Sequence, residues 1–400
     1  MGDMQNSIIA KIIIIIVTGI VTFLFTANLE LPRKTDVNLV QKTPSAATTT
    51  LEKQSEKTTE AATAVKNISL GEKTTEKSIL KPKIKPGNQP ETSQPATTKP
   101  VPSPPPAPKK LIPLEELNEK ARAAIVNIFC TTKTGGDFKP ISGSGIIIDG
   151  RGIILTNAHV AQYLLLKNYS TKDFITCVAR AGSPATPAYK IELLYFPAVW
   201  LAENAKEIKR GAPEGTGEND YALFLITGSA TLNHLPTSFP FVAIDTNQKN
   251  ILGEISLLLI GYPASFLGGI ATQKDLWITS SPSFITKFYY FGDKENIDAF
   301  SVGPNIIAQK GASGGAVISR WTGKVEGMLA TMSKGETTSE RELSAITIAH
   351  INRSFKSETG KSLDEFLSGN IDESFQEFTQ NTLPGLTKTL ESAVENISAN

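Results

Sequence analysis

The fold of this chain is decided by the stretch Lys310-Gly311-Ala312-Ser313-Gly314-Gly315-Ala316, a glycine-rich turn that holds one serine. An apolar run at 316–318 follows at once and predicts a strand. Gly311 has no Cβ atom, so it can adopt backbone angles that let its N–H and that of Ser313 converge on one point. Two converging N–H donors beside a hydroxyl are what an oxyanion hole requires. By itself such a turn is more typical of an ordinary connection between strands, and its meaning depends on a base and an acid elsewhere.

A base and an acid both lie upstream of this turn. Residues 152–160 predict a strand that ends at His159, one of only three histidines in the chain. Residues 218–226 place Asp220 at the start of a strongly apolar strand. Taken singly, each residue is more typical of a structural role, because histidines often follow strands and aspartates often end turns. Together, His159, Asp220 and Ser313 supply the base, the orienting acid and the nucleophile that activation of a serine requires.

The motifs in this order resemble the chymotrypsin-like serine proteases, especially their HtrA-like bacterial branch. The matching residues are G-S-G-I-I-I-D at 143–149, T-N-A-H-V at 156–160, D-Y-A-L at 220–223 and G-A-S-G-G at 311–315. Each motif is weak to moderate by itself, whereas four in this order form a strong signal. The resemblance covers about residues 115–355. It implies an all-β protease domain over 111–355, a double six-stranded β-barrel with short flanking helices and a site between the barrels.

The resemblance also implies the roles of the site residues. His159 is expected to act as the base, Asp220 to orient it and Ser313 to attack, while the N–H groups of Gly311 and Ser313 form the oxyanion hole. Ala312 departs from the family pattern, because digestive members carry aspartate there and many HtrA-like members carry asparagine. We therefore expect no activation by clipping of the N-terminus. The departure also leaves open whether the oxyanion loop is set before substrate binds.

The substrate pocket is expected around three apolar residues. Ile307 lies six residues before Ser313, where trypsin-like members carry the acid that attracts lysine or arginine. Ala330 and Met332 follow at the spacing where the family builds a wall of its specificity pocket. An apolar set of this kind favours a small or medium apolar side chain immediately before the cleaved bond.

The N-terminal segment is predicted to anchor the protein in a membrane. Residues 8–27 are almost wholly apolar and reach the length of a spanning helix, with Lys11 near one end. A cleaved signal peptide is the alternative, but Phe25 suits a cleavage site poorly. We therefore expect a single-pass transmembrane anchor within 1–30. The resemblance, and not the flanking charge, places the protease domain outside the cytoplasm.

Residues 31–110 are predicted to be a disordered linker. They are rich in Thr, Lys, Glu, Ser, Ala and Pro and contain few large apolar side chains, so they cannot bury enough surface to offset the entropy of ordering. Prolines gather in the second half and include the run at 104–106, which favours an extended chain. The linker is expected to hold the protease domain away from the membrane.

The only two cysteines, Cys130 and Cys177, both fall on predicted strands of the first barrel. In an oxidising compartment they could form one disulfide. Two cysteines that never meet are an equally open alternative, because strand positions alone do not fix the distance between them.

The C-terminal tail, 356–400, is predicted to be helical. Ser362 and Glu365 have the spacing of a capping box, and Leu386, Leu390 and Val394 recur at helical spacing. This apolar face could pack on the barrels, pair with another copy of the chain or dock a partner. No β-rich segment of PDZ size is predicted after the protease domain.

Composition excludes several other classes of function. The net charge is +1, and Arg and Lys do not cluster with aromatic residues, so nucleic-acid binding has no support. No phosphate-binding loop or cofactor motif is present, and His234 and His350 lack the neighbours of a metal site, so we expect no cofactor and no metal. We read both histidines as structural or exposed.

Two functional hypotheses remain. The first is a membrane-anchored serine endopeptidase that cleaves polypeptides outside the cytoplasm, in protein quality control or processing. The second is an inactive protease-like domain that acts as a tethered protein-binding module. The complete set of His159, Asp220 and Ser313, with both glycines after the serine, favours the first hypothesis.

Overall fold

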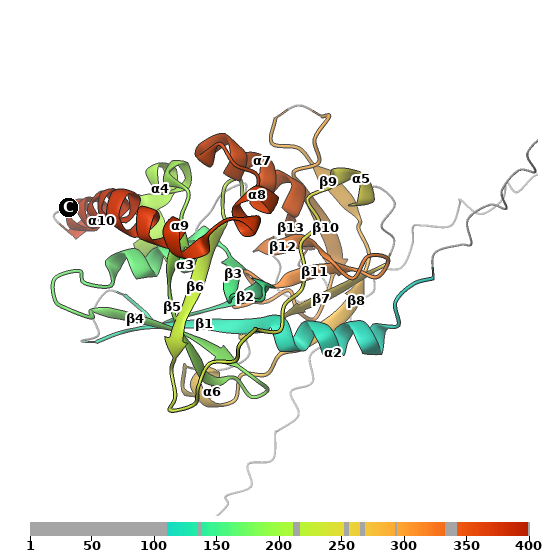
Figure 1. Ribbon diagram of the computed structural model, residues 1–400, viewed down its shortest axis with the longest axis horizontal. Helices are drawn as coiled ribbons and strands as arrows, with labels where there is room; N and C mark the ends of the chain where they lie inside the picture. The colour runs from blue at the N-terminus through green and yellow to red at the C-terminus, as the bar shows by residue number, and fades with distance from the viewer. Residues whose placement is uncertain are drawn as a thin grey trace, which may run out of the picture. The chain divides into compact units, whose positions relative to one another are not determined.

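The first half of the folded region is a closed barrel of six strands (Figure 1). The computed structural model describes residues 110–133, 138–210, 217–251, 256–264, 269–292, 294–332 and 342–398, all within one unit that spans 99–400. The predicted anchor at 1–30, and all of the predicted linker except residue 110, lie outside the described residues. Among the helices of the described ranges, none is both long and apolar enough to cross a membrane.

The barrel strands pair in the order β1-β2-β3-β6-β5-β4. Their bounds are Ile125–Thr132 for β1, Ile141–Asp149 for β2, Ile153–Thr156 for β3, Ile175–Ala181 for β4, Thr186–Tyr195 for β5 and Ala222–Ser229 for β6. Apolar runs such as 146–148 and 153–155 are buried on both faces, which explains why these segments form central strands. The predicted first barrel is confirmed.

The second half is a seven-stranded sheet in the order β8-β7-β11-β12-β13-β10-β9. The strands are β7 Leu257–Gly261, β8 Thr279–Ser283, β9 Lys287–Tyr289, β10 Ala299–Pro304, β11 Ala316–Ser319, β12 Val325–Met332 and β13 Glu342–Thr347. The structure thus keeps the predicted all-β character but differs from a six-stranded barrel in strand number and, within the described ranges, in closure. Pro282 lies in β8 and has no N–H to donate, which suits an edge strand.

One helix directly precedes the first strand along the chain, and another directly follows the last. Helix α2, Leu114–Ala124, precedes β1 and buries Leu117 and Ala121. Helix α7, Ile348–Thr359, follows β13. Strand β13 ends at Thr347 because the Thr347 hydroxyl accepts a hydrogen bond from the His350 N–H and caps the helix.

Short helices connect the barrel strands near the site. They are α3 (Ala158–Ala161) and the 3₁₀ helix η1 (Gln162–Leu166) after β3, and α4 (Ala198–Asn204) and the 3₁₀ helix η2 (Ala205–Arg210) after β5. In the second half, α5 (Gln248–Ile251) precedes β7 and α6 (Gly269–Lys274) precedes β8.

The C-terminal segment is helical and packs on the first barrel. It comprises α8 (Leu363–Ser368), α9 (Ile371–Glu377), a π-helical turn (Phe378–Thr382) and α10 (Leu383–Ser398). Ser362 and Glu365 form the capping box. Leu386, Leu390 and Val394 are buried in the apolar cluster of the first barrel, where α10 contacts α4, η1 and η2 (Figure 1). Of the three alternatives for this apolar face, the structure shows packing on the chain's own barrel.

Candidate active site

His159 is held by both oxygens of one carboxylate. Its ring Nδ1 lies 2.8 Å from Asp220 Oδ2, and its backbone N–H donates to Asp220 Oδ1 at 2.9 Å. The histidine lies in α3, which starts directly after β3, so the sheet fixes where the ring is placed. Asp220 is buried, and the His159 side chain is 17% exposed. The ring nitrogen away from the carboxylate, Nε2, is therefore the one that is free to exchange a proton.

The loop that carries Asp220 is fixed from two sides. Asn157 Nδ2 donates to the Asp220 carbonyl at 2.9 Å, and Asp220 N–H closes a turn onto Gly217. On the other side, Ser354 of α7 donates to Asn219 Oδ1 at 2.6 Å. The Tyr221 hydroxyl donates to the Ser354 hydroxyl, and burial raises the pKa of Tyr221 to about 12, so it remains a neutral donor. These contacts hold the loop that carries Asp220 in a fixed position.

Ser313 lies in the turn between β10 and β11, and this turn packs against the end of β3. A Cβ atom added to Gly314, whose φ is +83°, would collide with the Ser144 carbonyl and come within 2.6 Å of Thr156 Oγ1. Thr156 is the last residue of β3, three positions before His159. The fold thus brings the serine turn and the histidine to the same edge of the first barrel. Among the described residues, Ser313 Oγ forms no hydrogen bond with His159.

Two N–H groups of this turn are available to an oxyanion. The Lys310 carbonyl accepts from Ala264 N–H at 2.7 Å, and the Ala312 carbonyl accepts from Gly315 N–H at 2.9 Å. In a trans peptide the carbonyl and the following N–H point in opposite directions, so these bonds fix the directions of the Gly311 and Ser313 N–H groups. Neither N–H has a hydrogen-bond partner within the described part of the chain. Gly311 has a φ of +92°, and a Cβ there would lie 2.7 Å from the Tyr262 carbonyl.

Residues 143–328 match the family described as Trypsin-like peptidase domain. The chain contains a trypsin-like peptidase domain. The resemblance to the trypsin-like serine proteases is thereby confirmed. A crystal structure of the serine endoprotease from Yersinia pestis is similar at 18% sequence identity and a TM-score of 0.37, covering 62% of this chain and 67% of that chain. No curated protein matches the sequence.

Ala312 has no polar role in this peptidase domain. It is 1% exposed and packs in the apolar interior of the second sheet with Leu257, Val302 and Ile307. The position where relatives carry an acid or amide is therefore part of the core. The shape of the serine turn is instead held by hydrogen bonds to its carbonyl groups.

The expected substrate pocket is placed differently by the structure. Ile307 is fully buried in the interior of the second sheet, so it does not line an accessible pocket. Ala330 lines a cavity of about 280 Å³ whose lining residues do not include Ile307. The side chain of Met332 lies outside the described parts of the chain. The distance of Ile307 from Ser313 along the chain does not show which way its side chain points, and the structure places it in the sheet interior.

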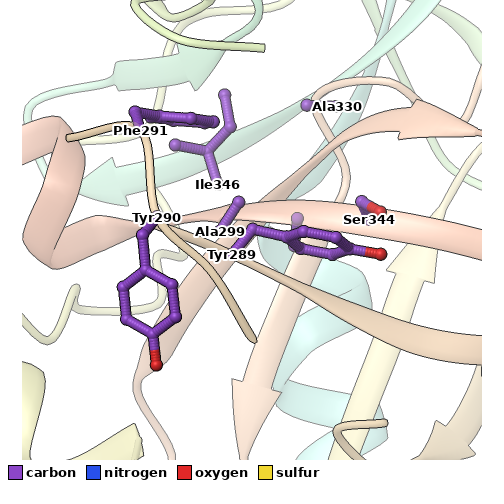
Figure 2. A pocket seen from close by; sticks show the side chains of 8 residues that line it. Tyr289, Tyr290, Phe291, Ala299, Ala330, Ser344 and Ile346 are labelled. Atoms are coloured by element: carbon purple, nitrogen blue, oxygen red, sulfur yellow. The ribbon is translucent and has the colours of Figure 1, made fainter. Parts of the chain in front are cut away.

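The cavity is lined mainly by aromatic and aliphatic side chains (Figure 2). Its lining residues are Tyr289, Tyr290, Phe291, Ala299, Ala330, Ser344, Ala345 and Ile346. They come from β9, β10, β12 and β13 and from the residues just after β9. Figure 2 shows Tyr290 pointing away from the other labelled rings. Ala330 directly follows Leu329, whose carbonyl accepts from Gly314 N–H at 2.8 Å, so the cavity begins close to the serine turn.

The two cysteines are joined. Cys130 of β1 and Cys177 of β4 are direct cross-strand partners, and their sulfur atoms form a disulfide. The sequence left this pairing open because the pairing depends on the register of the two strands.

Neither of the other two histidines is hydrogen-bonded to Asp220 or Ser313 among the described residues. His234 is exposed, whereas His350 of α7 is buried and lies 2.8 Å from Asp298. The described residues contain no group of three or more His, Cys, Asp or Glu side chains that could hold a metal ion. Asp298 and Ser144 have no local sequence pattern that signals their partners, so neither could be assigned a role from the sequence.

Proposed function

We propose that this protein is a serine endopeptidase that uses His159, Asp220 and Ser313. The observation that carries the proposal is the double contact of Asp220 with His159, in a trypsin-like peptidase domain whose serine turn packs beside it. A carboxylate bound to Nδ1 selects the tautomer that leaves Nε2 as the base, and it stabilises the imidazolium formed when Nε2 takes a proton.

The proposed reaction proceeds in two steps. His159 Nε2 removes the Ser313 hydroxyl proton while Ser313 Oγ bonds to the scissile carbonyl carbon, and the oxyanion is bound by the N–H groups of Gly311 and Ser313. The C–N bond then breaks, and His159 passes its proton to the leaving amine. Water attacks the acyl-enzyme by the same route and releases the carboxylic acid.

The cavity beside Ala330 is the proposed site for an apolar side chain of the polypeptide substrate. None of its eight lining residues is charged, so it offers nothing to pair with lysine or arginine. Its volume of about 280 Å³ leaves room for a branched or aromatic side chain. This replaces the smaller pocket expected around Ile307.

The proposal also includes a single-pass membrane anchor at the N-terminus and a peptidase domain outside the cytoplasm. The disulfide between Cys130 and Cys177 supports an oxidising compartment, because thiols in the cytosol are kept reduced. Proteins that are misfolded or await processing in that compartment are the proposed substrates. Alkaline extraction of membranes, combined with protease protection of vesicles, tests both anchoring and orientation.

One observation favours the alternative of a tethered binding module without activity. Ser313 Oγ and His159 are not hydrogen-bonded among the described residues, so the nucleophile is not yet aligned with its base. Hydrogen bonds of this kind often tighten only when substrate binds. A chemical probe of the serine separates the two functions.

The decisive experiment exposes the full-length protein to a fluorophosphonate probe. The parent protein is expected to be labelled, whereas Ser313→Ala and His159→Ala are not. If the folded parent remains unlabelled even with unfolded casein present, the endopeptidase proposal is wrong and the binding module is favoured. Labelling that appears only with casein shows that substrate aligns the serine with its base.

A further inference from the structure

We propose that Ser144 is a positioning residue for the oxyanion hole, acting through the backbone of the serine turn. The inference rests on the proposed peptidase function and assigns a role to a residue of the first barrel that contacts no reacting atom. Ser144 lies in β2, opposite Asn127 of β1, and is completely buried.

All four hydrogen-bonding groups of Ser144 have partners. Its hydroxyl donates to the Gly311 carbonyl at 2.8 Å and accepts from Tyr262 N–H at 2.9 Å. Its N–H donates to the Ser313 carbonyl at 2.7 Å. Its carbonyl accepts from Thr156 Oγ1, also at 2.7 Å. The Ser144 side chain therefore ties the Gly311 peptide of the serine turn to the residue after β7, and the Ser144 backbone N–H holds the Ser313 carbonyl.

Together with the hydrogen bonds from Ala264 and Gly315, the contacts of Ser144 fix the backbone of the serine turn. Four consecutive carbonyls, those of residues 310–313, each accept one hydrogen bond. Ala264 and Gly315 hold the first and third, as described above, and Ser144 holds the second and fourth. Because each peptide is planar, fixing its carbonyl fixes its plane. Ser144 therefore orients the peptides directly after the two that carry the Gly311 and Ser313 N–H groups.

The site requires a small side chain that both donates and accepts. An alanine at 144 would leave the Gly311 carbonyl and the Tyr262 N–H buried without partners, which costs about 1–3 kcal/mol per group unless the backbone rotates to find others. Rotation of the Gly311 peptide would misdirect the oxyanion donors. A larger side chain is opposed by packing, because even a Cβ atom on Gly261 would lie 3.2 Å from the Ser144 hydroxyl.

The test compares steady-state kinetics of the full-length parent with Ser144→Ala, Ser144→Cys and Ser142→Ala. Ser142 lies on the same strand and accepts from Asn127 Nδ2, but among the described residues it forms no hydrogen bond with the serine turn, so Ser142→Ala is the matched control. Removing an oxyanion donor costs about 10²–10³ in kcat, and a misdirected donor should cost less. We expect Ser144→Ala to lower kcat and the rate of fluorophosphonate labelling by about tenfold to a hundredfold.

Several readouts distinguish positioning from a general structural effect. KM should stay within about twofold and the midpoint of the pH–rate profile should not move, because the contacts of His159 are unchanged. Thermal unfolding shows whether each variant is folded. Ser144→Cys keeps a donor and an acceptor that are weaker than the hydroxyl, on a slightly larger atom, so its rate should fall between those of the parent and Ser144→Ala. It takes the place of the alanine variant if that variant does not fold.

The outcomes separate this inference from the proposed function. An active parent with Ser144→Ala or Ser144→Cys folded and as fast as Ser142→Ala would overturn the role of Ser144 and leave the peptidase proposal intact. A loss that appears in KM alone would overturn it as well. A folded parent without labelling or turnover would instead show that the peptidase function itself is wrong.

Discussion

The molecule contains two histidine–aspartate pairs with the same contact distance and different surroundings. His159 Nδ1 lies 2.8 Å from Asp220, and His350 Nδ1 lies 2.8 Å from Asp298. Both aspartates are buried. The distance between the two side chains therefore does not distinguish a catalytic pair from a structural one.

The aspartates differ in what else they bind. Asp220 directs both oxygens at His159, one to the ring and one to the backbone N–H. Asp298 is shared, because Oδ1 also accepts from Arg353 at 2.7 Å and Oδ2 accepts from Phe291 N–H at 2.7 Å. The second pair thus joins α7 to the segment after β9 and the start of β10.

The histidines differ in what their second nitrogen faces. His350 packs edge-on against Phe291, with ring centroids 4.9 Å apart, and its Nε2 is buried without a partner among the described residues. His159 lies beside the turn that carries Ser313. A histidine–aspartate pair acts as a base only where Nε2 can reach a group with a proton to give, and in the proposed mechanism Ser313 is that group for His159.

The largest expected effect comes from exchanging the two histidines for alanine. His159→Ala should lower the rate of peptide hydrolysis by at least about 10⁴-fold, because it removes the base. His350→Ala should leave kcat of the folded fraction within about threefold. Hydrolysis of a fluorogenic peptide measures both. Equal losses in the two variants, with both proteins folded, would contradict the division into catalytic and structural pairs.

Asp298→Ala should give the next largest effect, on stability. It removes the carboxylate that binds His350, Arg353 and the Phe291 N–H, and breaking a buried ion pair in this way costs about 3 kcal/mol. Urea unfolding of the parent and the variant measures the free energy of unfolding. Asp275→Ala, at an exposed position, is the control and should change it by less than about 0.5 kcal/mol. A variant as stable as the control would show that the second pair is dispensable.

A third variant tests whether the cavity next to the His350–Asp298 pair also binds substrate. Phe291 contacts His350 and also lines the cavity. Ala299→Val would narrow that cavity from β10 without altering either pair. We expect kcat/KM for peptides with a large apolar side chain to fall by about tenfold, while peptides with alanine in that place are cleaved as before. Equal changes in kcat/KM for both peptides would show that the cavity does not bind the substrate side chain.

The smallest expected effect is a dependence of stability on pH. Burial lowers the pKa of His350 below its ordinary value of 6.5 and outweighs the opposing contact with Asp298. Burial by itself would raise the pKa of Asp298, but its hydrogen bonds from Phe291, Arg353 and His350 outweigh that effect and lower it below 3.8. Both folded-state pKa values lie below the unfolded ones, so the unfolded state takes up protons first as pH falls.

Stability should therefore decrease as the pH drops below about 6.5, first through His350 and at lower pH through Asp298. Melting temperatures of the parent and His350→Gln at pH 7.5 and pH 5.5 test this expectation. The parent should lose more stability on acidification than the variant. An identical loss in both would show that His350 does not titrate differently in the folded and unfolded states.

Local sequence patterns predicted the parts of the molecule whose structure depends on interactions between residues close together in the chain. Short motifs predicted the strands of the first barrel and the helix cap at Ser362. They also placed His159 and Asp220 next to strand ends. The structure places His159 and Asp220 in direct contact across 61 residues of sequence. The distance from this pair to Ser313 was not fixed by any motif.

Contacts between distant segments were not predictable from the chain alone. Asp298 and His350 are 52 residues apart and have no shared motif, and the Ser144 hydroxyl reaches Gly311 across 167 residues. The burial of Ile307 depends on which face of the second sheet its side chain packs against, and the sequence does not show this. The number of strands in the second sheet depends on β8 and β9, which are short and partly exposed.

Packing of α10 against the first barrel has a consequence for synthesis on the ribosome. Domains fold as units while the chain emerges from its N-terminus, so the first barrel is made long before residues 383–398 exist. Until then, the apolar surface of η1, η2 and α4 that Leu386, Leu390 and Val394 cover stays open to chaperones. Chaperones should therefore bind unfinished chains at this apolar surface and dissociate when α10 packs on it.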